Sequence, residues 1–220
     1  MIHAVIFDLD GTLVDSNDLH VEAWQETFRH FGKEFSSSEL RQQIGKGDDQ
    51  YLPEFLNEHE LHTIGGEVTK FRGELFKKKY LKQVRPFPKV RELIEKLHAG
   101  GKRIALASSG NGNDVAHYVD LLGISNLIEA QTTKTEVKHS KPHPDVFSSV
   151  LHHLHLQADE AIAVGDTPYD VRAAKKIELP AVALLCGGFP EGELRGSGAI
   201  AIFRDPADLL ENYLRSPLCG

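Results

Sequence analysis

The feature that most constrains this 220-residue chain is an alternation of short apolar runs with amphipathic segments. The nearly continuous apolar runs are four to five residues long and lie at 4–7, 104–107, 127–130, 161–164 and 181–185. Such runs are typical of strands that are buried on both faces of a parallel sheet. Apolar residues at helical spacing lie between them, for example Val90, Leu93 and Leu97. This order predicts an α/β fold with a doubly wound parallel sheet.

One stretch breaks the alternation. Between about Asp15 and Lys82 only helical patterns occur, and one of them carries an apolar stripe that includes Trp24 and Phe28. The following segment, 85–88, contains two prolines, which mark a return to the main domain. We therefore expect an α/β core domain formed by 1–14 and 83–220, and a small helical cap domain at 15–82 that is inserted after the first strand.

The charge balance limits the possible partners. The formal net charge is -7, and an acidic protein lacks the basic footprint that nucleic acids require. Two cysteines, Cys186 and Cys219, form neither a disulfide framework nor a metal-site spacing. No targeting segment and no apolar stretch of membrane-spanning length are evident. We expect a cytoplasmic protein that binds neither nucleic acid nor membrane, and nothing indicates an obligate protein partner.

Two carboxylates follow the first apolar run, in the order Asp8-Leu9-Asp10-Gly11-Thr12. The carboxyl edge of an open α/β sheet is where ligands bind. An Asp carboxylate can attack phosphorus to form an aspartyl-phosphate, and a second carboxylate can protonate the leaving oxygen and activate water. The alternative is that Asp10 and Gly11 form a simple turn.

Two more carboxylates, Asp166 and Asp170, follow the run at 161–164. Carboxylates that crowd together repel one another unless a cation joins them, and Mg²⁺ prefers hard oxygen ligands. The alternative role is helix N-capping, which Thr167 and Pro168 favour and which is compatible with metal binding.

Two further elements complete a candidate phosphate site. Ser108 and Ser109 follow the run at 104–107, where a hydroxyl and free backbone N–H groups before a helix form an anion pocket. Lys141 precedes Pro142, and a lysine held there can neutralise phosphate and the charge of the nucleophile. Taken singly, each has an ordinary alternative, a turn serine and a solvated surface lysine.

Together these segments resemble the four motifs of the haloacid dehalogenase superfamily of phosphohydrolases. The matching segments are DLDGT, the first Ser after IALA, the Lys of SKP, and GDTPYD, and they span Asp8 to Asp170. The resemblance implies a Rossmann-like core, Mg²⁺ as cofactor and a small phosphorylated metabolite as substrate.

The resemblance also implies roles for single residues. It implies Asp8 as nucleophile, Asp10 as general acid/base, and Lys141 as a further catalytic residue. The implied phosphate-binding residues are Asp8, Leu9, Asp10, Ser108, Ser109 and Lys141. The implied metal ligands are Asp8, Asp10 through its main-chain carbonyl, and Asp166. Asp170 would either support the metal or hold Lys141, and the two roles stay open.

Within the superfamily, the chain is similar to the capped subclass that includes phosphoglycolate phosphatase and β-phosphoglucomutase. The dehalogenases lack the second aspartate, which is present here as Asp10, and the ATPase members need additional domains. The mutases use a cap arginine, which the loop 44–50 lacks. We therefore predict a phosphatase. A phosphosugar mutase and a non-catalytic binding protein are the alternatives, and sugar phosphates, phosphoglycolate and nucleotides all stay open as substrates.

Two cap residues are further candidates for substrate contact. His20 lies where core and cap meet, and it could position Asp10, touch the substrate or simply pack in the hinge. Lys46 lies between two glycines, so its backbone can approach a ligand closely. We expect its loop to close over the active site and Lys46 to favour a substrate with a second anionic group. The alternative is a flexible loop ahead of a helix.

Overall fold

The structure is a computed structural model that describes residues 1–219, apart from the side chain of Thr135. Its centre is a six-stranded sheet with the strand order β5-β4-β1-β6-β7-β8, and all neighbouring strands are parallel. The strands are β1 (Ala4–Phe7), β4 (Arg103–Ala107), β5 (Ile128–Thr132), β6 (Ala161–Gly165), β7 (Ala181–Leu184) and β8 (Ala201–Phe203). The predicted doubly wound parallel sheet is confirmed.

Two edge strands differ from the sequence-based expectation. β5 is an edge strand in which half-buried positions alternate with exposed ones and only Thr132 is buried, whereas its apolar run predicted burial on both faces. β8 has three half-buried residues and forms the other edge, and the sequence analysis missed it although it ends a continuous apolar run at 199–203.

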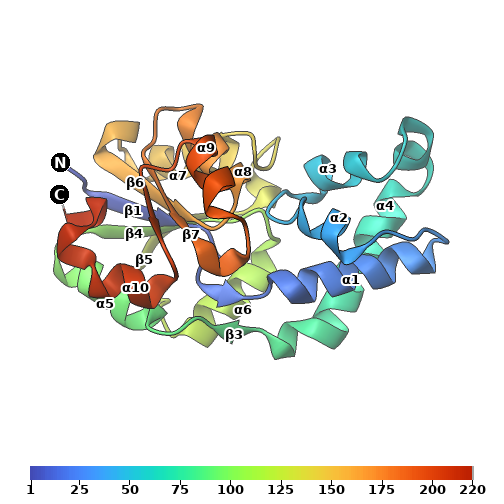
Figure 1. Ribbon diagram of the computed structural model, residues 1–220, viewed down its shortest axis with the longest axis horizontal. Coiled ribbons are helices and arrows are strands. Elements are labelled where there is room, and N and C mark those ends of the chain that lie inside the picture. The colour runs from blue at the N-terminus through green and yellow to red at the C-terminus, as the bar shows by residue number, and fades with distance from the viewer. Residues whose placement is uncertain (220) are drawn as a thin grey trace.

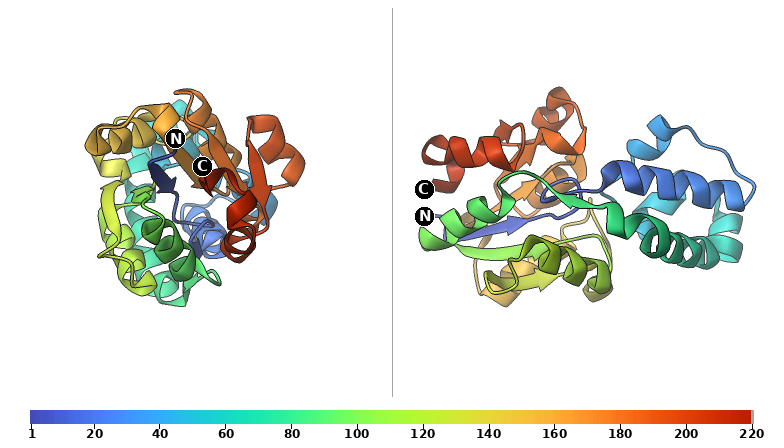
Figure 2. Two further views of the ribbon diagram at one scale, coloured as in Figure 1. Left: turned by 90° about the vertical axis from the view of Figure 1, so that its left-hand side faces the viewer. Right: turned by 90° about the horizontal axis from the view of Figure 1, so that it is seen from below.

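The two faces of the sheet carry side chains of different size. One face presents large residues such as Phe7 and Leu106, and the other presents mainly alanines such as Ala105 and Ala163. The first face is covered by α5 (Val90–Ala99), α6 (Gly112–Leu122) and α10 (Pro206–Glu211), and the second by α7 (Asp145–Leu154), α8 (Pro168–Lys175) and α9 (Glu191–Ser197). Figure 2 shows the sheet between these two helical layers.

A second group of helices lies beyond one end of the sheet, opposite the two chain termini (Figure 1). It comprises α1 (Asn17–His30), α2 (Ser37–Arg41), α3 (Asp48–Tyr51) and α4 (Glu58–Leu75), which continues into a π-helical turn, Phe76–Tyr80. These helices have their own aromatic core, in which the Trp24 and Tyr51 rings stack with their centroids 4.4 Å apart. The helical cap is therefore present after the first strand.

A short antiparallel pair, β2 (Val14–Asp15) with β3 (Arg85–Pro86), lies where the chain leaves and re-enters the core. The predicted domain limits, 15–82 for the cap, fall within three residues of this pair and stay a prediction. Among residues 1–219, no helix combines the length and apolar character needed to cross a membrane.

Candidate active site

Three carboxylates predicted from two separate motifs meet at the carboxyl edge of the sheet. Asp8 directly follows β1, Asp166 directly follows the neighbouring strand β6, and Asp170 lies in the first turn of α8. All three residues are buried, and one oxygen of each lies within 4.8 Å of the others. The parallel register places the strand ends side by side, so sequence segments about 160 residues apart form one acidic cluster.

Lys141 is the cation of this cluster and is only 1% exposed. Its ammonium donates hydrogen bonds to Asp8 Oδ1 at 2.5 Å and to the Ala107 carbonyl at 2.7 Å. It also lies 2.8 Å from Asp170 Oδ1, an ion-pair contact that lacks hydrogen-bond alignment. Burial alone would lower the pKa of Lys141, but the charges of Asp170 and Asp8 raise it, so the lysine stays charged.

The pKa of Asp8 is also raised, which favours the neutral form of this carboxyl group. Burial raises the pKa of Asp8 to about 7. The negative charges of Asp170 and Asp10 add to this shift, and the Lys141 ammonium opposes it without cancelling it. Burial and the charges of Asp170 and Asp8 likewise raise the pKa of Asp166. One lysine therefore does not neutralise this group of buried carboxylates.

Asp166 is fixed by two neutral donors. Thr12 Oγ1 donates to its Oδ1 at 2.7 Å, and Asn17 Nδ2 donates to its Oδ2 at 2.9 Å. A Cβ atom on Gly187 would lie 1.7 Å from Asp166 Oδ2, so the backbone approaches this carboxylate in a way that only glycine permits. A buried, oxygen-only donor set with uncompensated negative charge fits the preferences of Mg²⁺. The side chain of Asp10 lies outside this cluster, and the predicted contribution of its main-chain carbonyl stays a prediction.

Asp10 is held by residues at the hinge between core and cap. Its Oδ1 accepts hydrogen bonds from Ser16 Oγ at 2.6 Å and lies 2.7 Å from His20 Nε2. Burial raises the pKa of Asp10, but the charge of His20 and these hydrogen bonds outweigh burial and lower the pKa to about 2. Of the roles open to His20, the structure shows contact with Asp10 and also packing, because its ring stacks on Phe76 at 4.2 Å.

Arg72 is a residue of this site that the sequence analysis missed. It comes from α4, its Nη2 lies 2.5 Å from His20 Nδ1, and its guanidinium lies over the rings of Trp24 and Phe76. A signal was available, because Arg72 lies four residues after Val68 and so shares its inward helix face. The cap arginine therefore lies on α4 and not in the loop 44–50, where the sequence analysis expected it.

The predicted phosphate-binding residues surround Asp8. Ser108 directly follows β4 and is buried, and its Oγ accepts a hydrogen bond from Gly110 N at 2.9 Å. The Ser109 hydroxyl is buried and has no hydrogen-bond partner among the described residues. The side chain of Leu9 is fully buried, so only its main chain is available to a ligand.

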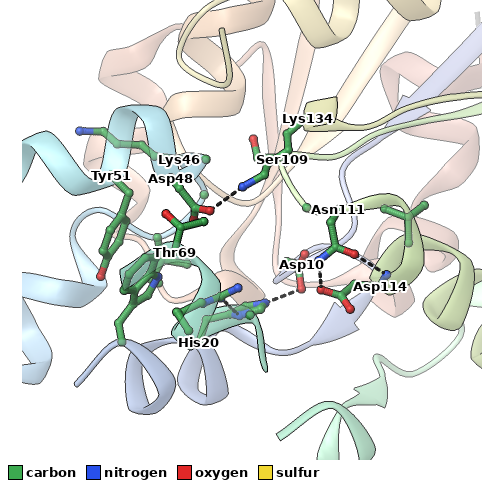
Figure 3. A pocket seen from close by; sticks show the side chains of 18 of the residues that line it. Asp10, His20, Lys46, Asp48, Tyr51, Thr69, Ser109, Asn111, Asp114 and Lys134 are labelled. Atoms are coloured by element: carbon green, nitrogen blue, oxygen red, sulfur yellow. Dashed lines mark hydrogen bonds and ion pairs between the residues drawn. The ribbon is translucent and has the colours of Figure 1, made fainter. Parts of the chain in front are cut away.

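The cap loop 45–47 lies against the core. Gly47 N donates to Ser140 Oγ at 3.0 Å, next to Lys141, and Asp49 accepts a hydrogen bond from Ser140 N at 3.1 Å. Lys46 does not point toward Asp8. Its ammonium donates to Glu54 at 2.7 Å and to Gln43 at 2.6 Å, and Figure 3 shows it directed away from Asp10.

A cavity of about 290 Å³ lies between cap and core, with Asp8 and Asp10 among its lining residues. Figure 3 shows that side chains from both parts surround it. His20, Tyr51 and Arg72 line it from the cap, and Asp114 and Tyr118 line it from α6. An ion pair between Lys134 and Asp48, 2.5 Å long, joins core to cap at its rim. This partly open space can hold a small substrate with one end at Asp8.

Comparison with known proteins gives consistent matches. Residues 5–184 match the family model described as haloacid dehalogenase-like hydrolase. A phosphoglycolate phosphatase from Yersinia pestis is 34% identical over 196 residues, which cover 84% of this chain and 82% of the relative. A phosphorylated carbohydrates phosphatase from Thermotoga maritima is 25% identical over 218 residues, 99% of this chain and all of the relative. The crystal structure of a hydrolase from Pseudomonas syringae, 27% identical, covers 96% of this chain and 98% of its own with a TM-score of 0.88.

Proposed function

The chain belongs to the haloacid dehalogenase-like hydrolase family and is a phosphoric monoester hydrolase, and we propose that it acts on a small phosphorylated metabolite through an aspartyl-phosphate at Asp8. The observation that carries the proposal is the buried pair of Asp8 and Lys141 at the carboxyl edge of the sheet, 2.5 Å apart. A carboxylate fixed by a buried ammonium beside an open cavity is a positioned nucleophile with its charge compensation in place.

Mg²⁺ is the proposed cofactor, held by Asp8, Asp166 and the main-chain carbonyl of Asp10. When bound, it would withdraw negative charge from the phosphoryl oxygens. For Asp170 we propose mainly the second of its two predicted roles, support of Lys141. Its Oδ1 lies 2.8 Å from the ammonium, while its Oδ2 accepts hydrogen bonds from the N–H and hydroxyl of Thr167 at the start of α8.

In the first half of the proposed reaction, a carboxylate oxygen of Asp8 attacks phosphorus and the ester P–O bond breaks. Lys141, together with Ser108 and the main chain of Leu9 and Ser109, binds the phosphoryl group as this happens. The leaving oxygen takes a proton from the carboxyl group of Asp10, so Asp10 has to be protonated when this half begins.

In the second half, Asp10 takes a proton from water, the water oxygen attacks phosphorus, and the Asp8 carboxylate is released with inorganic phosphate. Because the pKa of Asp10 is lowered to about 2, its carboxylate is ionised at neutral pH, the form that this half requires. Ser16 and His20 both bind Oδ1, so the second carboxylate oxygen is left for the reacting water.

A phosphosugar mutase remains the second candidate, because Arg72 places a cap arginine at the cavity after all. It would transfer the phosphoryl group back to another hydroxyl of the sugar in place of water. Incubation with a hexose 1-phosphate separates the two candidates: a mutase forms the 6-phosphate isomer without net phosphate release, and a phosphatase releases phosphate.

The test of the proposal is phosphate release from p-nitrophenyl phosphate and a panel of phosphorylated metabolites, with Mg²⁺ and after removal of metal by EDTA. We expect activity only with Mg²⁺, and a loss of several orders of magnitude in Asp8→Asn. Asp159→Asn, an exposed carboxylate in the turn before β6, is the matched control and should behave as wild type. Full activity in EDTA, or more than a tenth of wild-type activity in Asp8→Asn, would overturn the proposal. The cytoplasmic location stays a prediction.

A further inference from the structure

We propose that Asp114 is a specificity-determining residue, which selects phosphate esters whose remote part carries hydroxyl groups and no second negative charge. The inference rests on the proposed phosphatase function, because it concerns the part of the same cavity that lies beyond the transferring phosphoryl group. Asp114 lies in the first turn of α6 and lines the cavity, as Figure 3 shows.

The lysines of the cavity are already engaged in ion pairs and are not free to bind a second anionic group. Lys46 and Lys134 line the cavity, and Lys141 binds Asp8. All three lysines have an acidic partner within 2.7 Å, namely Glu54, Asp48 and Asp8 in the same order. A remote carboxylate or second phosphate of a substrate would have to compete with these ion pairs.

Arg72 retains one unused donor, because its buried Nε has no hydrogen-bond partner within the described part of the chain. Its positive charge, however, acts on the carboxylates of both Asp10 and Asp114. One guanidinium charge does not balance these two carboxylates. A second anion would therefore add uncompensated negative charge beside Asp114.

Asp114 itself has an acceptor oxygen available. Asn111 Nδ2 donates to its Oδ2 at 2.6 Å, whereas its Oδ1 accepts no hydrogen bond from residues 1–219. Burial and the charge of Asp10 raise the pKa of Asp114, so the surroundings already disfavour more negative charge. A donor on the substrate would stabilise the ionised carboxylate.

Tyr118 offers the complementary group. It follows Asp114 by four residues on α6, so the two side chains lie on one helix face. Its side chain lines the cavity and is 1% exposed, and its hydroxyl lies near the Asp10 carboxylate but makes no aligned hydrogen bond within the described part of the chain. A buried hydroxyl without a partner is destabilising unless a ligand or a water satisfies it.

A substrate hydroxyl is the group that matches this pair of residues. It can donate to the carboxylate of Asp114 and accept from the phenol of Tyr118 at the same time. An ionised carboxylate or phosphate has acceptors only and would repel Asp114. The cavity volume of about 290 Å³, roughly that of ten water molecules, suits a short polyol or sugar phosphate.

The experiment compares esters of equal chain length that differ in their remote groups. The six-carbon series is D-glucitol 6-phosphate, 6-phosphogluconate and n-hexyl phosphate. The three-carbon series is sn-glycerol 3-phosphate, 3-phosphoglycerate and n-propyl phosphate. In the series that fills the cavity, we expect kcat/KM for the polyol ester to exceed that for the carboxylate ester and the alkyl ester by at least about tenfold. The reason is that buried polar groups of the site are left unpaired when the substrate lacks the matching hydroxyl.

The matched variants are Asp114→Asn and Asp120→Asn, two changes of the same type on the same helix, of which Asp120 is exposed. In Asp114→Asn the preference for the polyol ester over the carboxylate ester should shrink by about tenfold, because the repulsive charge is gone. In Asp120→Asn both the preference and the activity toward p-nitrophenyl phosphate should stay at the wild-type level.

A binding measurement separates failure of this inference from failure of the proposed function. Trp24 lines the cavity and is the single tryptophan, so its fluorescence reports binding of the same esters to Asp8→Asn without turnover. Binding in the predicted order without hydrolysis by wild type would overturn the proposed function and leave the role of Asp114 intact. Equal or better binding and turnover of the carboxylate esters, or an unchanged preference in Asp114→Asn, would overturn the inference about Asp114.

Discussion

His20 Nε2, on the first cap helix, lies 2.7 Å from Asp10 Oδ1, on the loop that follows the first core strand. The contact joins the two parts of the molecule at the residue that we propose as general acid/base. It exists only while α1 keeps its position over the core. The position of α1 and the lowered pKa of Asp10 are therefore linked in this structure.

We expect His20→Ala to lower kcat by about 10- to 100-fold with little change in KM. This loss is smaller than the full effect of general acid–base catalysis, because Asp10 itself is still present. Removing His20 also removes the main cause of the lowered pKa of Asp10, so the acidic limb of the pH–rate profile should move to higher pH. His30→Ala, on the exposed face of the same helix, is the control. A kcat within twofold of wild type and an unmoved profile would show that His20 only packs in the hinge.

Lys141→Met should destabilise the metal-free protein. The change leaves Asp8 and Asp170 buried without their cation, and breaking a buried ion pair in this way costs about 3–5 kcal/mol. Urea unfolding in EDTA measures the free energy of unfolding. The exposed Lys138→Met is the matched control. A loss of less than 1 kcal/mol would mean that the carboxylates are neutral without Lys141.

The stabilising effect of Mg²⁺ should grow as the pH rises. The pKa of Asp8 is raised from its ordinary 3.8 to about 7, so the metal-free folded protein binds more protons than the unfolded chain between these values. The contribution of Asp8 to the free energy of unfolding is therefore greatest below about pH 4 and is lost as the pH rises through 7. Mg²⁺ needs the deprotonated carboxylates, so the increase in Tm with excess Mg²⁺ should be larger at pH 7.5 than at pH 5.5. An equal or smaller increase at pH 7.5 would argue against metal binding at this cluster.

Lys46 and Glu54 should behave as one unit. Because the Lys46 ammonium binds Glu54 at 2.7 Å, Lys46→Ala and Glu54→Ala break the same ion pair and loosen the same loop. A partly exposed pair is worth about 0.2–1 kcal/mol, so both variants should raise KM similarly, by no more than about fivefold. If Lys46→Ala raises KM more than tenfold and Glu54→Ala does not, Lys46 contacts the substrate after all.

The motif residues could be predicted from the sequence because each follows a continuous apolar run. Asp8, Ser108 and Asp166 come directly after β1, β4 and β6, and parallel strands end at one edge. For these residues, position along the chain determines position in space. The same logic would also have found β8, because its three residues end a continuous apolar run at 199–203 that the sequence analysis left out.

The cavity beyond Asp10 could not be predicted in this way. Arg72 and Tyr118 lie on helix faces whose direction depends on how cap and core pack. Lys46 illustrates the same limit: its glycine neighbours indicate a mobile loop, but they do not show that the ammonium turns to Glu54. Long side chains in a cap are placed by tertiary contacts, for which the local sequence carries little signal.

The most direct test of the account is chemical trapping of the covalent intermediate at Asp8. Wild-type protein is mixed with Mg²⁺ and its best substrate, quenched within the first turnovers, reduced with borohydride and analysed by peptide mass spectrometry. An acyl phosphate at Asp8 is reduced to the alcohol, so the account predicts homoserine at position 8, dependent on both substrate and Mg²⁺ and absent at Asp10. Homoserine at another carboxylate, or active enzyme with unmodified Asp8 under every quench time, would contradict it.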